Sequence, residues 1–257
     1  MEQRAQAVLT SGNNECFVCN GTGWELYQQY VEEYECSLTF ARHCPKCSGQ
    51  RHKDFTRVPE QFADADIGKF DFDTYPDKYS NGMEKLWKIA YSMLNNWKEW
   101  DMQSRGLYLW SKTPGSGKTF LACCLGKSIM VKHNLQMRFI STPNYISAVG
   151  ESFKRERGEA DESETFRNCK LLILDDIGSQ IGREWQSQEL FKLIDKRNTE
   201  GKITIYTSNM PPESLNLEDR VKSRIIDRSI VIQMPEESIR LRKSQQRQQK
   251  FLQALGI

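Results

Sequence analysis

The sequence has no long hydrophobic run. No stretch of its 257 residues approaches the roughly 18 consecutive apolar residues that a membrane-spanning helix needs. A membrane-spanning protein is therefore excluded from the expected classes, and the cytoplasm is the expected location. The sequence also lacks an internal repeat of about 20 to 50 residues, which excludes a solenoid of stacked repeats.

An excess of charge of either sign is absent as well. Lys and Arg number 36 and Asp and Glu number 34, which gives a net charge of +2. The overall charge therefore gives no indication of nucleic-acid binding, and any such contact has to come from a local patch of basic residues.

Cysteine is present but unevenly distributed, because five of the eight cysteines lie in residues 1–52. Four of them form two CxxC pairs, each followed by a turn that contains glycine. Such a turn lets backbone amides face thiolate sulfurs, and four thiolates suit tetrahedral Zn²⁺ better than a disulfide in a reducing compartment. We expect a small zinc module at residues 1–54, with Cys16, Cys19, Cys44 and Cys47 as the ligands.

Two other residues near the second pair, Cys36 and His43, leave a Cys3His site open as an alternative. Between the pairs, residues 25–40 contain several aromatic and few basic residues. This composition favours a protein partner over a nucleic-acid backbone.

Beyond residue 55 the sequence alternates between apolar strand patterns and helical patterns, which predicts an α/β domain over residues 55–257. Residues 106–110, GLYLW, are typical of a buried strand, and residues 119–134 carry apolar residues at helical spacing. Residues 83–100 repeat aromatics at helical spacing and predict the first core helix.

Between that strand and the second helix lies SKTPGSGKTF, residues 111–120, which resembles a phosphate-binding loop. Backbone N–H groups at the start of the helix would converge on phosphate oxygens, where the helix dipole also favours anions. Lys118 would neutralise the β and γ phosphates, and the Thr119 hydroxyl would bind Mg²⁺. We expect the nucleotide-binding residues of this stretch to be Pro114, Gly115, Ser116, Gly117, Lys118, Thr119 and Phe120.

Lys112 stands where the motif has its first glycine. That glycine eases a turn away from the phosphates, so its loss is expected to strain the start of the loop without removing a ligand. We therefore predict a working ATP site and leave slow turnover open.

Two acidic residues follow the apolar run in CKLLILDDIG, residues 169–178, as expected for a central parallel strand. Asp175 would hold Mg²⁺ through water, and Asp176 would orient or deprotonate the attacking water, although it could merely cap the next segment. Residues 202–212 predict another strand that ends near Asn209, which could bind the same water. Residues 183–197 predict a crossover helix.

These motifs in this order resemble the AAA+ ATPases of the DnaC, DnaI and IstB group, which are bacterial helicase loaders and their transposition-helper relatives. The resemblance spans about residues 57–245 and includes RVKSRI at 220–225 and SIR at 238–240. It implies an AAA+ P-loop domain, with a parallel sheet flanked by helices and a basic C-terminal helix, preceded by the zinc module.

The resemblance also implies roles for two arginines. Arg220 would be the arginine finger that reaches a neighbouring subunit's ATP, with Arg224 as its rival, and Arg240 would contact the phosphates of its own subunit. Considered alone, arginines at i, i+4 and i+8 in this stretch are typical of a solvated helix face. Ile239 departs from the tyrosine usual in the family. The family's adenine pocket corresponds to Val58, Pro59 and Phe62.

We expect an ATP-dependent helicase loader that oligomerises on ATP, binds single-stranded DNA and places a hexameric DnaB-type replicative helicase. Lys154, Arg155 and Arg157 would meet DNA, or belong to a solvated loop. Three alternatives remain: an IstB-like helper that delivers a transposase, a nucleotide-gated adapter with little hydrolysis, and a sequence-specific zinc-dependent DNA binder. The small number of basic residues in the first 40 positions argues against the last.

Overall fold

The computed structural model describes the backbone of residues 24–31, 36–43, 57–152, 162–178 and 184–255. The chain divides into two compact units, Met1–Phe55 and Thr56–Ile257, and each is described by itself. Among the described residues, no helix combines the length and the apolar composition that crossing a membrane would need.

The described part of the first unit is an antiparallel hairpin of β1 (Trp24–Val31) and β2 (Cys36–His43). Trp24 pairs with His43 at one end, and Val31 pairs with Cys36 at the other. The hairpin occupies the segment between the two CxxC pairs, and the four expected zinc ligands lie outside the described residues.

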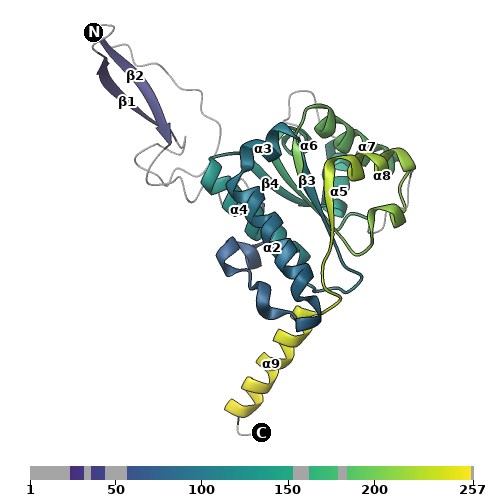
Figure 1. Ribbon diagram of the computed structural model, residues 1–257. Coiled ribbons are helices and arrows are strands. Elements are labelled where there is room, and N and C mark those ends of the chain that lie inside the picture. The colour runs from purple at the N-terminus through teal and green to yellow at the C-terminus, as the bar shows by residue number, and fades with distance from the viewer. Residues whose placement is uncertain (1–23, 32–35, 44–56, 153–161, 179–183, 256–257) are drawn as a thin grey trace. The chain divides into compact units, whose positions relative to one another are not determined.

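The second unit contains a parallel sheet of five strands in the order β4-β5-β6-β3-β7 (Figure 1). The expected fold class is confirmed, as are strands within 106–110, 169–178 and 202–212. The two further strands are the edge strands of the sheet and carry weaker signals, because Arg138 interrupts one apolar run and the other is only partly buried. The strands are β3 (Gly106–Trp110), β4 (Met137–Ser141), β5 (Leu171–Asp175), β6 (Ile203–Ser208) and β7 (Ser229–Gln233).

Alternate strand residues point to opposite sides of the sheet, and both sides carry apolar side chains. Helices therefore cover both faces. Leu107 and Leu109 belong to a core cluster under α2 and α4, whereas Tyr108 between them belongs to a second cluster under α5 to α8. The helices are α2 (Ser80–Asn95), α3 (Trp97–Met102), α4 (Lys118–His133), α5 (Thr142–Ser152), α6 (Glu162–Asn168), α7 (Glu184–Thr199), α8 (Asp219–Arg228) and α9 (Ile239–Ala254). Short 3-10 turns are η2 (Glu60–Phe62), η3 (Ile67–Lys69), η4 (Phe72–Thr74), η5 (Asp77–Tyr79) and η6 (Pro212–Ser214).

The prediction of one helix over residues 83–100 is wrong, because the chain breaks between α2 and α3 at Asn96, where φ is −109° and ψ is 36°. Asn95 contributes to this break, since its Nδ2 donates to the carbonyl oxygen of Tyr91 over 2.8 Å and competes with the helix backbone. The break lets Trp97 enter the core.

Arg197 is a fully buried cation on α7. Its Nη1 donates to the carbonyl oxygens of Phe166 and Cys169, both at 2.9 Å. Its Nη2 donates to the carbonyl oxygen of Ile203 over 2.6 Å, and its Nε donates to Thr204 Oγ1 over 2.9 Å. Arg197 thereby ties the start of β6 to the chain that enters β5.

The C-terminal helix α9 extends away from the rest of the second unit (Figure 1). Ile239, in its first turn, is its only buried residue. Ser238 caps the helix, since its Oγ accepts the N–H of Leu241.

Candidate functional site

The P-loop, residues 111–117, joins β3 to α4 at the carboxyl edge of the sheet. Trp110 at the end of β3 pairs with Ser208 at the end of β6. A cavity of about 740 Å³ opens at this edge, where parallel α/β sheets bind their ligands. It is lined by the P-loop, the ends of β5 and β6, one face of α9 and the segment around Phe62.

Glu236 secures the start of the P-loop. Its carboxylate accepts the N–H of Lys112 over 3.0 Å, and the N–H and hydroxyl of Thr113, both over 2.8 Å. Burial raises the pKa of Glu236, but these hydrogen bonds outweigh it, so the pKa lies below its ordinary value. Lys112 is not among the described residues with left-handed φ. The expected strain at Lys112 is therefore absent, because this backbone conformation does not require glycine.

Glycine is required at two later positions of the P-loop. Gly115 has φ +78° and Gly117 has φ +95°, and a Cβ on Gly117 would lie 2.7 Å from Tyr75 Oη. Tyr75 in turn donates its hydroxyl hydrogen to the carbonyl oxygen of Ser116 over 2.7 Å. The P-loop is thus held from behind by a buried tyrosine that sequence reasoning did not identify.

The Lys118 side chain lies inside the P-loop and is only 7% exposed. Its Nζ donates to the carbonyl oxygens of Ser111 (3.1 Å) and Thr113 (3.3 Å) and to Ser116 Oγ (3.2 Å). Burial lowers the pKa of Lys118, because desolvation disfavours the charged form. An ammonium held only by loop oxygens in a cavity is available to an anion that enters it.

Asp175 ends β5, and its Oδ1 accepts two hydroxyl hydrogens, from Thr119 over 2.7 Å and from Thr207 over 2.6 Å. Burial raises the pKa of Asp175, and the two hydrogen bonds oppose this shift. A carboxylate and a hydroxyl side by side form the kind of oxygen donor set that Mg²⁺ prefers.

Asp176 follows in the left-handed conformation, with φ +57°. Its N–H donates to Thr207 Oγ1 over 3.0 Å, and its Oδ1 accepts Nδ2 of Asn209 over 3.2 Å. Thr207 therefore contacts both acidic residues. It immediately precedes Ser208 and Asn209 at the end of the predicted strand, so its position was visible in the sequence but its contacts were not.

Arg240 lines the same cavity, and its backbone N–H donates to the carbonyl oxygen of Gly115 over 3.2 Å. Three further cations of α9, which sequence reasoning did not assign to the site, also line it: Lys243, Arg247 and Lys250. Their spacing from Arg240 is i+3, i+7 and i+10, which corresponds to one helix face. Within the described parts of the chain, no ion pair involves any of these four side chains.

The expected adenine pocket is only partly assembled here. Phe62 and Phe120 both line the cavity, and their ring centroids lie 5.7 Å apart. Val58 instead packs against the core, and Pro59 precedes the η2 turn, so neither residue lines the cavity.

Arg220 lies outside this cavity. Its guanidinium forms an ion pair with Glu218 over 2.7 Å and lies 4.3 Å from the centroid of the Phe191 ring. The Arg224 guanidinium forms an ion pair with Asp195 and lies 4.8 Å from the centroid of the same Phe191 ring. Both candidate fingers are thus held on the α7 and α8 surface of their own chain.

The expected DNA contacts Lys154, Arg155 and Arg157 lie outside the described residues, as do all four CxxC cysteines. In the described ranges, no group of three or more His, Cys, Asp or Glu side chains is arranged to hold a metal ion.

Known proteins resemble this chain in sequence and in fold. Residues 99–247 match the family model described as IstB-like ATP binding protein. The chromosomal replication initiator protein DnaA of Streptococcus equi subsp. zooepidemicus (strain H70) is 27% identical over 210 residues, which are 79% of this chain and 45% of that protein. The chain therefore spans less than half the length of this curated relative.

Two solved structures support the fold assignment. A putative primosome component from Streptococcus pyogenes serotype M3 has a TM-score of 0.60 at 18% identity, over 75% of this chain and 97% of that chain. The DnaC helicase loader has a TM-score of 0.57 at 24% identity, over 68% of this chain and 99% of that chain. At these identities the two solved structures support the fold alone. The family model, in contrast, matches more than half of the sequence and shows the family. The chain therefore belongs to the IstB-like ATP-binding proteins, within the AAA+ ATPase class.

Proposed function

We propose that this protein is a Mg²⁺-dependent ATPase that oligomerises on ATP, binds single-stranded DNA and places a hexameric DnaB-type replicative helicase on it. The observation that supports this proposal is the convergence of Lys118, the Thr119–Asp175 pair and Arg240 on one cavity at the sheet edge.

The charge of the cavity fits a triphosphate. Five cations line it, four of them from α9 and the fifth being Lys118, whereas Asp175 and Asp176 are its only carboxylates among the described residues. The P-loop N–H groups and the start of α4 add a field that favours anions. Phe62 and Phe120 offer the apolar surface that a nucleobase needs.

Thr119 and Asp175 would hold the Mg²⁺, because their oxygens already lie 2.7 Å apart. The ion would neutralise charge on the β- and γ-phosphate oxygens. Lys118 would bind those same phosphates, and the P-loop N–H groups would fix their position.

Asp176 and Asn209 would position the water that hydrolyses ATP. The water oxygen forms a bond to the γ-phosphorus while the bond to the β–γ bridging oxygen breaks, which yields ADP and phosphate. The water proton passes to the Asp176 carboxylate and then to solvent. Arg240 would stabilise the charge that develops on the transferred group.

Arg220 of a neighbouring copy would complete the site in trans. For this it has to leave Glu218 and the Phe191 ring, both of which hold it in the single chain. Assembly would therefore exchange a surface ion pair, worth little in water, for contact with a triphosphate.

The module of residues 1–54 would bind one Zn²⁺ and serve as a docking or DNA-binding adapter. This proposal rests on the two CxxC pairs of the sequence and on a reducing cytoplasm that keeps the thiols free.

The family match favours a second candidate, in which the same ATP site serves delivery of a transposase to target DNA. The two candidates share their chemistry and differ in their partner. A third candidate is a nucleotide-gated adapter. It differs from the first two because it binds ATP but hardly hydrolyses it.

To test the proposal, the purified protein is mixed with the replicative helicase of its host, ATP and Mg²⁺, and the mass of the eluting complex is measured by light scattering. Several copies on a helicase hexamer are expected, and the Lys118→Ala variant should fail to form that complex. Separate elution with and without ATP would overturn the loader, and co-elution with a transposase would then support the second candidate. ATP turnover unaffected by Lys118→Ala and Asp175→Ala would contradict the proposed ATP site in either case.

A further inference from the structure

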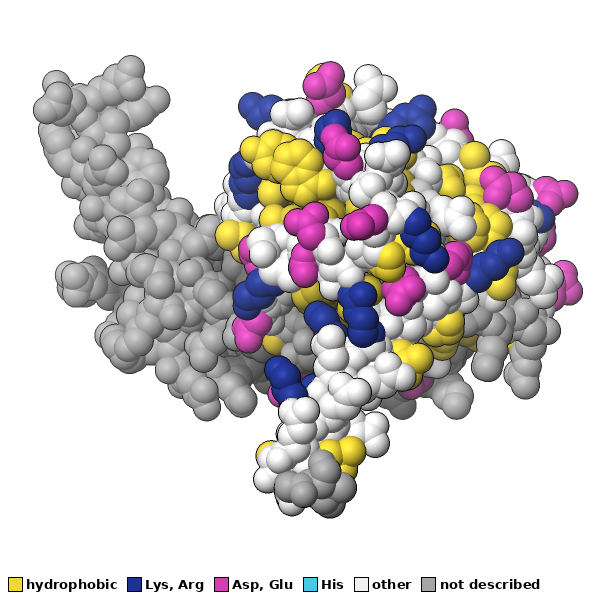
Figure 2. Space-filling view, turned by 60° about the horizontal axis from the view of Figure 1, so that its bottom comes forward, with side chains coloured by type: hydrophobic (Ala, Val, Ile, Leu, Met, Phe, Trp, Pro, Cys, Tyr) yellow, Lys and Arg dark blue, Asp and Glu magenta, His cyan; other side chains and the backbone are white. Residues whose placement is uncertain are grey.

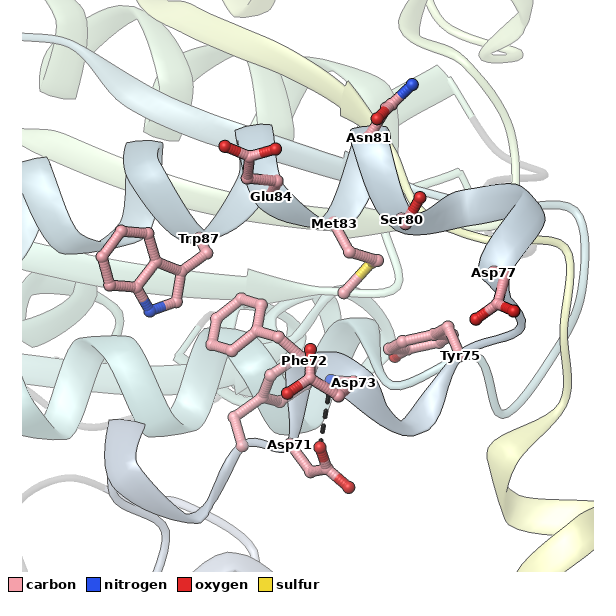
Figure 3. Close-up of a pocket in the computed structure, with 11 residues that line it drawn as sticks. Asp71, Phe72, Asp73, Tyr75, Asp77, Ser80, Asn81, Met83, Glu84 and Trp87 are labelled. Atoms are coloured by element: carbon pink, nitrogen blue, oxygen red, sulfur yellow. Dashed lines mark hydrogen bonds between the residues drawn. The ribbon is translucent and has the colours of Figure 1, made fainter.

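A second cavity, of about 610 Å³, lies between α2 and the chain that precedes it. In Figure 3, Met83 and Trp87 extend from α2 toward Phe72, and Tyr75 stands at one end. We call it the acidic pocket, and its lining is distinct from that of the nucleotide cavity.

The acidic pocket carries four carboxylates and no cation in its described lining: Asp71, Asp73, Asp77 and Glu84. Asp71 Oδ1 accepts the N–H of Asp73, and Glu84 pairs with Lys88. The carboxylates of Asp73 and Asp77 make no ion pair within the described residues. This surface therefore repels phosphate and attracts a cationic segment.

Exposed aromatic surface adjoins these carboxylates. Trp87 is 44% exposed and Tyr91 is 55% exposed, and their rings stack with centroids 5.1 Å apart. Figure 2 shows hydrophobic, acidic and basic side chains interspersed on the face from which α9 projects. Exposed aromatic side chains are enriched at protein interfaces, and unpaired charge steers a partner of opposite charge toward them.

Helix α9 has the complementary composition. Its five cations are accompanied by no acidic residue, and its distal end exposes Phe251 (63%), Leu252 (37%) and Leu255 (57%). Arg247 and Lys250 lie in the same distal half, and they also line the nucleotide cavity of their own copy. This end of α9 therefore offers positive charge and apolar surface together, which complement the carboxylates and the exposed aromatic surface of the acidic pocket.

Two contacts hold the chain's own α9 so that it points away from the acidic pocket of the same chain. Arg240 N–H donates to the carbonyl oxygen of Gly115, and the Arg242 guanidinium donates to the carbonyl and hydroxyl oxygens of Thr74. From these contacts the helix runs straight out of the second unit (Figure 1). Its distal end cannot return to the acidic pocket of the same chain without breaking them.

We propose that the acidic pocket of one copy binds the distal half of α9 from a second copy. The contact joins two different surfaces, so it is heterologous and propagates into a ring or a filament. This inference goes beyond the proposed function, because the contact involves neither Arg220 nor a helicase nor DNA.

The acidic pocket also adjoins the P-loop. Tyr75 lines the pocket and donates its hydroxyl hydrogen to the carbonyl oxygen of Ser116. A helix seated in the pocket would touch the residue that supports the nucleotide site of the receiving copy.

A charge-exchange experiment on the full-length protein tests the proposal. The pocket variant carries Asp73→Lys and Asp77→Lys, and the tail variant carries Arg247→Glu and Lys250→Glu. Mass is measured by light scattering over a concentration series without ATP, because Arg247 and Lys250 also line the nucleotide cavity and their reversal would alter ATP binding. The dissociation constant for self-association of each variant alone should rise at least roughly tenfold, because like charges then face each other.

The equimolar mixture of the two variants should regain assembly, since each reversed tail meets a reversed pocket and each native tail meets a native pocket. This recovery also shows that both variants fold. Glu99→Lys with Glu151→Lys, which changes two exposed carboxylates outside the pocket by the same charge, should assemble like the wild type.

Three results would overturn the proposal: wild-type assembly in both reversed variants, no recovery in the mixture, or a wild type that stays monomeric throughout. Helicase binding lost in the pocket variant, without self-association of the wild type, would assign the pocket to a helicase contact instead. Loss of the helicase complex with self-association intact would overturn only the proposed function.

Discussion

The Thr207 hydroxyl donates its hydrogen to Oδ1 of Asp175 over 2.6 Å and accepts the N–H of Asp176 over 3.0 Å. One side chain thus fixes the carboxylate proposed for Mg²⁺ and the backbone of the residue proposed for water. It also supports the left-handed backbone conformation of Asp176, which residues other than glycine rarely adopt without such a contact.

Replacing Thr207 by Val, which keeps the shape and removes the hydroxyl, should lower kcat for ATP hydrolysis roughly 10- to 100-fold. ATP affinity should change little, because Lys118 and the P-loop N–H groups remain. Steady-state kinetics together with nucleotide titration would separate the two effects. Thr207→Ser should retain most of the activity, and equal losses in the Val and Ser variants would contradict this role.

Removing the carboxylate with Glu236→Ala should weaken ATP binding and lower the free energy of unfolding by about 1 to 3 kcal/mol, since the N–H groups of Lys112 and Thr113 lose a charged acceptor. Glu236→Gln should lose less. Urea unfolding and nucleotide titration measure the two effects.

The contribution of Glu236 should also depend on pH. The folded protein holds the pKa of Glu236 below its unfolded value, so the contribution is complete above the unfolded pKa and is lost as pH falls through the folded pKa. The difference in stability between wild type and Glu236→Gln should therefore shrink in acid. A difference that grows in acid would contradict the assignment.

Subunit mixing identifies the trans arginine. Arg220→Ala lacks the finger and Lys118→Ala lacks the nucleotide site, so each should be inactive alone. Their mixture should recover part of the ATPase activity, because intact sites then meet intact fingers. Full activity of Arg220→Ala, with such recovery seen for Arg224→Ala instead, would transfer the role to Arg224.

Arg197→Met should lower the free energy of unfolding by about 3 to 5 kcal/mol, because it leaves the buried carbonyl oxygens of Phe166, Cys169 and Ile203 without a donor. Urea denaturation measures the loss. The adjacent Lys196→Met, which removes only a partly exposed ion pair with Glu164, should cost well under about 1 kcal/mol. Similar losses in both variants would refute the role of Arg197.

Elemental analysis should find one zinc per chain. Cys16→Ser and Cys44→Ser should each reduce the metal content, whereas Cys123→Ser should not, because Cys123 is buried and burial raises the pKa of its thiol. Loss of zinc in Cys36→Ser with retention in Cys44→Ser would favour the Cys3His alternative.

Local sequence patterns were sufficient to predict the fold class, three strands and the position of the P-loop. The contacts that hold the P-loop were not predictable, because Glu236 lies 124 residues from Lys112 and Tyr75 lies 41 residues from Ser116. Their meeting depends on the strand order, and no local pattern encodes that. The expectation of strain at Lys112 failed because its φ lies outside the left-handed region, which the motif alone did not reveal.

The C-terminal helix illustrates the same limit. Its basic character was evident in the sequence, and the spacing of Arg240, Lys243 and Arg247 indicates one helix face. Which surface that face meets depends on the contact between Arg240 and Gly115, which only the three-dimensional structure provides. The roles of Asp176, Asn209 and Arg220 stay predictions.

Hydrogen bonds to Tyr75 and Glu236 affect the entropy of nucleotide binding by the P-loop. Tyr75 and Glu236 hold it through protein contacts alone, so its shape does not depend on a bound phosphate. Ordering a residue costs about 1 to 2 kcal/mol, and a loop that is already ordered avoids this cost on binding. Nucleotide binding should therefore carry only a small entropic penalty from the loop. The amides of Lys112 and Thr113, which donate to Glu236, should exchange slowly with solvent even without nucleotide.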